Sequence, residues 1–217
     1  MKSSERYTKS RESPFKMGRP RGNRRREHYY RTAKKQGYRS RSAFKLKQII
    51  RKHKLLRGVD RVVELCSSPG GWTQVLREEG EHLEIVAVDI SSMSPLPRVS
   101  FIKGDITDSK TIDEVKQRIG GTADLVLSDC SPNVTGIWEV DVTRQLDLAE
   151  RTIDLAMEIL TKNGKALTKV FQGPGFKEFL ESVKDRFELV RLVKPDASRK
   201  TSAEIYMLAM HPKGVKE

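Results

Sequence analysis

The apolar positions of this chain follow two spacings, one typical of helices and the other typical of strands. From about residue 40 onward, apolar residues recur every three to four positions in some segments, and short β-branched runs lie between those segments. Ala43, Phe44, Leu46 and Ile49 form one such helical stripe. The pattern predicts helices over 40–54, 72–79, 108–119, 143–160 and 175–186. It predicts strands over 61–66, 84–90, 99–103, 124–128, 165–171, 187–193 and 203–210.

The order of these elements predicts an α/β fold. Strands that are separated by helix-length connections form a parallel sheet with helices on both faces. Only a loop separates the last two strands, so we expect them to form an antiparallel pair. Five crossover strands followed by such a pair predict a seven-stranded, mostly parallel sheet of the Rossmann-like, S-adenosylmethionine-dependent methyltransferase type.

Basic residues are concentrated at the N-terminal end of the chain. The 217 residues carry a formal net charge of +13. Residues 1–36 contain 13 lysines and arginines and three acidic residues, and residues 37–57 add eight basic residues and no acid. The first 57 residues therefore carry +18, whereas the remaining 160 carry −5. We predict a basic, flexible extension over 1–36 and a Rossmann-like domain over 37–217.

The charge of this extension favours RNA as a partner. Lysine and arginine neutralise phosphates and release counterions, and aromatic side chains stack on unpaired bases. Tyr29, Tyr30 and Tyr38 lie among the basic residues and are the stacking candidates. A solubilising tail and a segment attracted to anionic lipid are the alternatives. The segment has no amphipathic apolar face, which argues against the lipid alternative.

Composition excludes several protein classes. No window approaches the roughly 18 consecutive apolar residues of a membrane-spanning helix, and the basic N-terminus lacks the apolar region of a secretory signal. Two cysteines, Cys66 and Cys130, do not indicate a disulfide framework, so we expect free thiols in a reducing, cytoplasmic setting. The four histidines have no metal-like spacing, and no metal is expected.

A glycine-rich loop follows the first predicted strand and opens a helix. It reads Glu64-Leu65-Cys66-Ser67-Ser68-Pro69-Gly70-Gly71-Trp72. Glycines allow a ligand to approach the backbone, and a helix N-terminus offers unpaired N–H groups. The dinucleotide motif and the phosphate-binding Walker motif are both absent. The alternative interpretation is an ordinary turn between a strand and a helix.

Two acidic residues follow the next two strands. Asp89 ends the second strand and is placed to accept hydrogen bonds from ribose hydroxyls. Asp105 follows the third strand and is placed to accept from an adenine amino group. Together with the loop at Gly70, these acids favour a nucleoside ligand that is held without a phosphate clamp, and S-adenosylmethionine fits that description.

Several further motifs resemble those of the FtsJ/RrmJ-type ribose 2′-O-methyltransferases of RNA. The resemblance extends from about residue 37 to the C-terminus. The matching stretches are Ser42-Ala43-Phe44-Lys45-Leu46, Pro69-Gly70-Gly71-Trp72, Val88-Asp89, Gly104-Asp105, Ser128-Asp129, Pro132-Asn133, Lys169-Val170-Phe171-Gln172-Gly173, Lys194-Pro195-Asp196, Ser198-Arg199 and Ser202-Ala203-Glu204-Ile205-Tyr206. The resemblance implies a catalytic set of Lys45, Asp129, Lys169 and Glu204. It also implies a cofactor site that includes Gly70, Trp72, Asp89, Asp105 and Asp129.

The strand order independently places the four catalytic candidates at one edge of the sheet. Asp129 ends the fourth strand, Lys169 lies near the end of the fifth, and Glu204 starts the last, antiparallel strand. Lys45 comes from the helix before the first strand. We expect Lys169 to be the general base, Asp129 to orient Lys169 and the methyl donor, and Lys45 and Glu204 to hold the ribose hydroxyl and the lysine pair. A surface ion pair is the alternative for each residue taken singly.

Two loop residues stand apart from this pattern. Cys66 occupies the position of the first glycine in the family's usual loop, so the turn has to accept a Cβ atom. Trp72 is either a ligand wall or a core residue, and Trp138 has no assigned role.

The resemblance, above all the match of the motif from Lys194 to Tyr206 to the bacterial members, implies a methyltransferase that acts on the ribose of a uridine in large-subunit ribosomal RNA, and we expect a cytoplasmic monomer. A tRNA ribose methyltransferase is the alternative within the same class. A non-catalytic RNA-binding or ribosome-assembly factor on this fold is the alternative outside it, and the intact catalytic set argues against that. A small-molecule methyltransferase leaves the basic extension unexplained.

Overall fold

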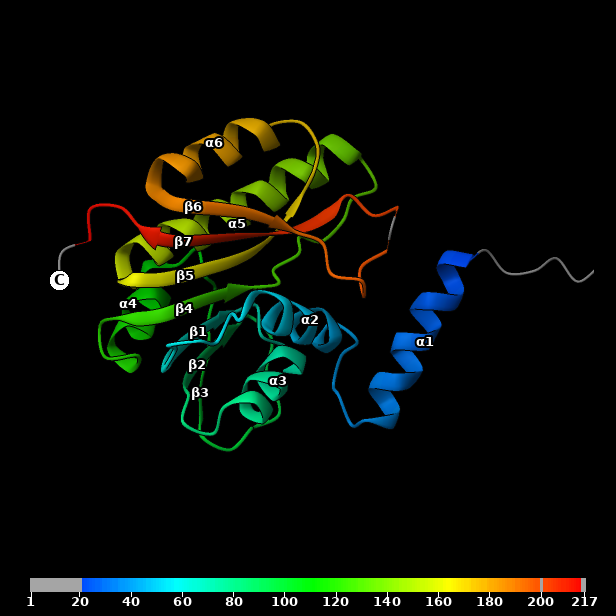
Figure 1. Ribbon diagram of the computed structural model, residues 1–217, viewed down its shortest axis with the longest axis horizontal. Coiled ribbons are helices and arrows are strands. Elements are labelled where there is room, and N and C mark those ends of the chain that lie inside the picture. Colours follow the sequence, from blue (N-terminus) through cyan, green and yellow to red (C-terminus); the bar gives the residue numbers. More distant parts are fainter. Residues whose placement is uncertain (1–20, 200, 216–217) are drawn as a thin grey trace, which may run out of the picture.

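A seven-stranded sheet between two helical layers forms the body of the protein (Figure 1). The computed structural model describes residues 21–199 and 201–215. The strands lie in the order β3-β2-β1-β4-β5-β7-β6. Their bounds are β1 Arg61–Leu65, β2 Glu84–Asp89, β3 Val99–Lys103, β4 Ala123–Ser128, β5 Leu160–Phe171, β6 Phe187–Val193 and β7 Glu204–Pro212. Strands β1 to β5 pair in parallel, and β7 pairs antiparallel with both β5 and β6.

The helices cover both faces of this sheet. On one face lie α2 (Ala43–His53) and α3 (Gly71–Glu79), whose buried residues join one apolar cluster. On the other face lie α4 (Ser109–Arg118), α5 (Trp138–Ile159) and α6 (Phe176–Arg186), whose buried residues join a second cluster. The predicted fold class is therefore confirmed, including the antiparallel pair at the end of the chain.

The central strands are apolar on both sides because both sides are covered. In β4, Leu125 and Leu127 pack toward α2 and α3, whereas Val126 packs toward α5. This alternation within a continuous apolar run is typical of a parallel sheet between two helical layers. It explains why the sequence shows short apolar runs in place of alternating polar and apolar positions.

Strand pairing brings the carboxyl ends of the parallel strands to one edge. Leu65 at the end of β1 pairs with Val88 of β2 on one side and with Ser128 of β4 on the other. At the end of β5, Phe171 pairs with Glu204, the first residue of β7. Because β7 runs antiparallel, its start meets the ends of the other strands, as the sequence predicts.

The helix α1 (Arg21–Lys35) precedes this body and was not predicted from the sequence. It stands beside the body in Figure 1 and joins it through α2. The Tyr29 ring packs on that of Phe44 with centroids 5.4 Å apart, and Ala33 is buried. Residues 1–20 of the basic extension lie outside the described residues.

Two of the three tyrosines proposed for base stacking are engaged within the protein. Tyr38 is buried, and its hydroxyl donates to Glu78. Tyr29 packs against Phe44, as above. The prediction that Tyr38 stacks on RNA is therefore wrong, because its ring belongs to the core next to α2. Tyr30 is 52% exposed and is open to such a contact.

Candidate active site

Lys169 and Asp129 meet at the carboxyl edge of the sheet. The Lys169 ammonium lies 3.3 Å from Asp129 Oδ1 and donates to the Asp129 main-chain carbonyl at 2.8 Å. The Lys169 side chain is only 6% exposed, and that of Asp129 is 20% exposed. From α5, Gln145 Nε2 donates to the Lys169 carbonyl at 3.0 Å. The end of β5 is thus held by Gln145 of α5 and by Asp129 after β4, and the Lys169 ammonium lies against the Asp129 carboxylate.

Lys45 and Glu204 form a second pair beside the first. Lys45 Nζ, on α2, donates to Glu204 Oε1 at 2.5 Å, and Ser198 Oγ donates to the same oxygen at 3.0 Å. The side chains of Lys45 and Glu204 are 14% and 17% exposed. This pair joins residues 159 positions apart, one from the helix before the first strand and one from the start of the last strand.

The Tyr206 hydroxyl joins the two pairs. It donates to Asp129 Oδ1 at 2.7 Å and accepts from Lys45 Nζ at 3.3 Å. Tyr206 is fully buried, and burial together with the Asp129 and Glu204 charges raises its pKa well above 10, so the phenol stays neutral. Although Tyr206 belongs to the matched motif, the sequence analysis assigned it no role. Its position two residues after Glu204 on one strand was the available signal, because such residues share a face.

The glycine loop is fastened to the end of β2 by Asp89. Its Oδ2 accepts from the Ser68 N–H at 2.9 Å, and its Oδ1 accepts from the Ser91 N–H at 2.7 Å. Gly70 adopts φ +101°, and a Cβ atom there would lie 2.7 Å from the Met93 sulfur. The position therefore needs glycine both for its conformation and for the close approach.

Glu64, near the end of β1, is a buried carboxyl that the sequence analysis did not single out. It is 2% exposed and accepts from Thr73 Oγ1 at 2.7 Å and from the Thr73 N–H in the first turn of α3. Burial, together with the nearby carboxylates of Asp129 and Asp89, raises its pKa to about 8 against the lowering effect of the Thr73 hydrogen bonds. An acid within an apolar strand was the available sequence signal.

Two predicted cofactor residues are engaged locally. The Trp72 side chain is 2% exposed, its Nε1 donates to the Ser42 carbonyl at 2.9 Å, and its ring packs against Tyr206. Only the main chain of Trp72 is therefore placed to contact a ligand. Asp105 is exposed, and its Oδ1 accepts from the N–H and hydroxyl of Thr107, which lower the Asp105 pKa.

The two cysteines form a disulfide, which corrects the expectation of free thiols. Cys66 follows β1 and Cys130 follows Asp129, and the adjacent strand ends bring their Cα atoms to 5.0 Å. Cys66 has φ +56°, so it keeps the left-handed conformation that suits the glycine of the usual loop. The chain spacing of 64 residues did not reveal this pair.

The acids around the loop fit a cationic ligand. Asp89 and Asp129 lie close enough to the protonated Glu64 for their negative charges to raise its pKa. A phosphate would be repelled there, whereas a sulfonium or ammonium group would be stabilised. Among the described residues, no group of three or more His, Cys, Asp or Glu side chains is arranged to hold a metal ion.

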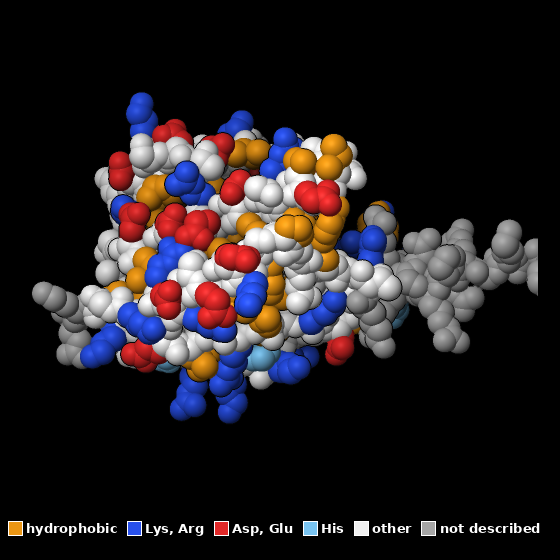
Figure 2. Space-filling model, turned by 90° about the horizontal axis from the view of Figure 1, so that it is seen from above, with side chains coloured by type: hydrophobic (Ala, Val, Ile, Leu, Met, Phe, Trp, Pro, Cys, Tyr) orange, Lys and Arg blue, Asp and Glu red, His pale blue; other side chains and the backbone are white. Residues whose placement is uncertain are grey.

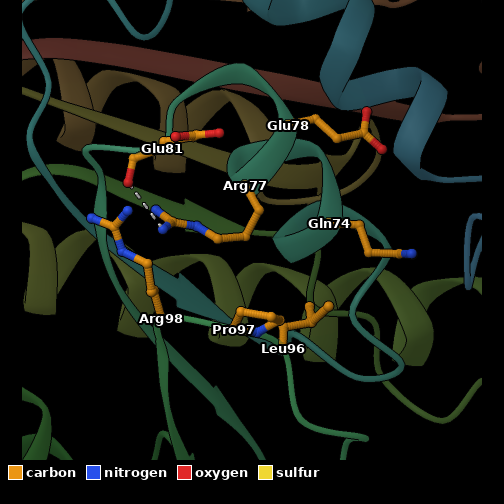
Figure 3. Close-up of a pocket in the computed structure, with 7 residues that line it drawn as sticks. All are labelled: Gln74, Arg77, Glu78, Glu81, Leu96, Pro97 and Arg98. Carbon is orange, nitrogen blue, oxygen red and sulfur yellow. Dashed lines mark hydrogen bonds between the residues drawn. The ribbon is translucent and has the colours of Figure 1, made fainter.

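A groove of about 510 Å³ lies apart from these residues, on the outer side of α3 (Figure 3). In this view, Arg77 is directed toward the main-chain carbonyl of Glu81, with Arg98 beside it. The full lining is Gln74, Arg77, Glu78, Glu81, Leu96, Pro97 and Arg98. None of the predicted catalytic or cofactor residues lines this groove.

Comparisons with known proteins match most of the chain. The family model described as FtsJ-like methyltransferase matches residues 38–211. Ribosomal RNA large subunit methyltransferase E from Methanothrix thermoacetophila is 47% identical over 182 residues, which are 84% of this chain and 71% of that protein. Proteins of the same name from Methanothermobacter thermautotrophicus and Archaeoglobus fulgidus are 42% and 44% identical; the matches cover 88% and 85% of this chain and 92% and 95% of those proteins.

Solved structures agree on the fold. The crystal structure of a ribosomal RNA methyltransferase from Plasmodium falciparum has a TM-score of 0.73 and 24% sequence identity. The match covers 81% of this chain and 98% of that chain. No helix within the described residues is both long enough and apolar enough to cross a membrane.

Proposed function

Because this chain belongs to the FtsJ-like methyltransferase family, we propose that it methylates the 2′-hydroxyl of a ribose in large-subunit ribosomal RNA. The methyl donor is S-adenosylmethionine, and the target nucleotide is a uridine. The large-subunit rRNA methyltransferase relatives and the RNA-type catalytic set support the substrate. The acids around the glycine loop support the donor, because it is a nucleoside with a cationic sulfur.

The residues that would hold the donor come from the ends of successive strands. They are Gly70, the main chain of Trp72, Asp89, Asp105 and Asp129. The bound donor supplies an electrophilic methyl group on a sulfonium, which leaves as a neutral thioether. Asp89 keeps acceptor capacity for ribose hydroxyls, since a carboxylate offers about four lone-pair sites and two are used by Ser68 and Ser91.

The catalytic set positions the ribose and removes its proton. Lys169, as a free amine, accepts the proton of the 2′-hydroxyl as the oxygen forms its bond to the methyl carbon. Asp129 holds the lysine through its carboxylate and its carbonyl. Lys45 and Glu204 hold the ribose hydroxyl in line for the displacement, and such positioning is a large part of the rate enhancement.

One observation carries this proposal. Lys45, Asp129, Lys169 and Glu204 come from distant parts of the chain and converge in one hydrogen-bonded network through Tyr206. The network lies at the carboxyl edge of the sheet, where ligands bind in this type of fold. A protein that only binds RNA would not need two largely buried lysine side chains, Lys45 and Lys169, beside the glycine loop.

The basic extension completes the proposal. We assign residues 1–36 to RNA binding and 37–217 to catalysis, in a protein that acts as a cytoplasmic monomer. Tyr30, Lys34 and Lys35 on α1 are exposed and support a nucleic-acid contact.

The direct test is incubation of the protein with methyl-labelled S-adenosylmethionine and three RNAs. These are unmodified large-subunit rRNA, ribosomal subunits that lack the modification, and tRNA. We expect label on a 2′-oxygen of large-subunit rRNA, located by alkaline hydrolysis resistance and mapped to one uridine. Label on tRNA alone would establish the alternative substrate. Binding of rRNA without any transfer would indicate a non-catalytic factor.

A further inference from the structure

An exposed apolar surface lies next to the catalytic edge. Val134, Ile137, Trp138 and Val140, here termed the 134–140 platform, are 70%, 59%, 45% and 36% exposed. They lie in the loop after β4 and in the first turn of α5. Apolar side chains gather at the end of the body where α5 begins, toward the right in Figure 2. A cluster of this kind on a folded surface typically marks a binding site.

The loop beneath the platform is held in place, so the exposure is built into the fold. The Asp141 carboxylate accepts from the Thr135 N–H at 2.7 Å, from the Thr135 hydroxyl at 2.8 Å and from the Gly136 N–H at 3.1 Å. These bonds lower the Asp141 pKa, the Thr135 N–H most of all. Gly136 has φ +86°, a conformation that suits glycine. The chain therefore fixes the platform with its apolar side chains toward the solvent.

The platform is continuous with the catalytic residues through Phe171. The Trp138 ring is stacked on the Phe171 ring, with centroids 6.1 Å apart and planes at 17°. Phe171 lies two residues after Lys169 on β5 and pairs with Glu204 across the sheet. The Phe171 ring thus lies between Trp138 and the catalytic edge. Trp138 itself remains 45% exposed.

We propose that Trp138 is a stacking site for a nucleobase of the RNA, that of a nucleotide adjacent to the methylated ribose. This inference rests on the proposed function and adds a subsite to it. An aromatic face accepts any base without reading its sequence, and unpaired bases are the usual target of such contacts. Val134 and Ile137 lie close in sequence to Trp138 and add exposed apolar surface to the platform.

The first test separates this subsite from chemistry. Trp138→Ala should lower kcat/KM for unmodified rRNA by roughly five- to a hundredfold, the range of one lost base stack. The rate at saturating RNA should change much less, and Trp138→Phe should retain most of the activity. Leu192→Ala is the matched control, because Leu192 is also 45% exposed but lies on the edge strand β6. An unchanged kcat/KM for Trp138→Ala, or an equal loss for Leu192→Ala, would overturn the proposal.

The second test observes stacking directly and needs no methyl transfer. The chain has two tryptophans, and Trp72 is buried, so a ligand that stacks on the platform quenches Trp138. A short single-stranded oligouridylate should quench the fluorescence, and its abasic analogue with the same phosphates should not. Trp138→Phe should remove the quenching. Equal quenching by both oligomers, no quenching at saturation, or quenching that persists in Trp138→Phe would each contradict the stack.

Two other outcomes are separable. One is a dimeric wild type and a monomeric Trp138→Ala variant by light scattering, with unchanged RNA kinetics. In that case the platform binds a second copy of the chain, and the proposal is wrong. If wild type methylates no RNA but the oligouridylate still quenches Trp138, the proposed function fails while base stacking stands.

Discussion

At the scale of single residues, the Tyr206 hydroxyl connects the two lysine–carboxylate pairs of the site. Its proton is directed to Asp129, and its oxygen accepts from Lys45. Because the phenol stays neutral, it cannot act as the base, and its contribution is to fix the Asp129 carboxylate that holds Lys169.

Removing this hydroxyl should slow methyl transfer without unfolding the protein. Tyr206→Phe keeps the ring that packs on Trp72 but loses hydrogen bonds to charged groups, each worth about 1.5–3 kcal/mol. We expect a single-turnover rate lower by roughly ten- to a hundredfold, with cofactor affinity retained. Tyr38→Phe is the control, since its hydroxyl also donates to a carboxylate but away from the site. A wild-type rate for Tyr206→Phe would show that the hydrogen bonds of the Tyr206 hydroxyl to Asp129 and Lys45 do not contribute to methyl transfer.

Glu64 gives stability a dependence on pH. In the unfolded chain its carboxyl ionises near the ordinary pKa of 4.5, whereas in the folded protein it keeps its proton up to about pH 8. Between these values the folded state binds more protons, so the free energy of unfolding falls by about 1.4 kcal/mol for each unit of rising pH. The contribution of the protonated Glu64 to the free energy of unfolding is therefore fully present below pH 4.5 and is lost as the pH rises toward 8.

Glu64→Gln cannot ionise and should lack that slope. The free energy of unfolding, measured with urea across this pH range, should therefore favour the variant over wild type increasingly as the pH rises toward 8. Parallel profiles for the two proteins would show that Glu64 is ionised in the folded state.

The sequence predicted the convergence of Lys45, Asp129, Lys169 and Glu204, because strand order brings together the ends that carry Asp129, Lys169 and Glu204 and the family resemblance adds Lys45 from the preceding helix. It did not predict the Tyr206 bridge. That contact joins residues 77 positions apart and depends on the β5–β7 register, which spacing along the chain does not reveal.

At the scale of elements, the disulfide fastens the end of β1 to the residue after Asp129. It joins the start of the glycine loop to the catalytic edge and closes a loop of 64 residues. Loop closure of this length corresponds to roughly 4 kcal/mol of stabilisation in the chain-entropy picture.

Reduction should therefore lower the free energy of unfolding by up to roughly 4 kcal/mol. The measurement is urea denaturation with and without dithiothreitol, with a thiol count to show that reduction is complete. The double variant Cys66→Ser, Cys130→Ser should match the reduced protein and should not respond to dithiothreitol. Equal stability of the oxidised and fully reduced wild type would contradict this assignment.

Two element boundaries show where sequence patterns fail. The helix α5 begins at Trp138, five residues before the predicted start, because its first turn is exposed and shows no apolar stripe. The helix α1 was missed because its few apolar residues pack on α2 and not on the sheet. Both segments carry residues for which we propose RNA contacts.

At the scale of the whole molecule, positive and negative charges are concentrated in different parts of the chain. The basic extension and α2 precede a mildly acidic domain that surrounds the cofactor loop with carboxylates. We propose that polyanionic RNA is attracted to the first of these regions and the cationic donor to the second.

Deleting residues 1–27 tests this division and leaves the Tyr29–Phe44 contact intact. The deletion removes ten of the 42 lysines and arginines. We expect weaker rRNA binding and a flatter slope of log affinity against log salt, by about 0.7–0.9 for each lost phosphate contact. Affinity for S-adenosylmethionine, measured by calorimetry, should not change. An unaltered salt slope would show that the extension does not touch RNA.

The central claim is that Lys169 accepts the proton of a ribose hydroxyl during methyl transfer to rRNA. The decisive measurement is single-turnover transfer at saturating rRNA for wild type, Lys169→Ala and the control Lys165→Ala, which removes a lysine from the middle of β5 whose ammonium donates to the Leu55 and Arg57 carbonyls and not to Asp129. We expect a wild-type rate that rises with pH, a loss of about 10²- to 10⁴-fold in Lys169→Ala with cofactor affinity retained, and little change in Lys165→Ala. A wild-type rate in Lys169→Ala would contradict the account and transfer the role of the base to Asp129 or to water.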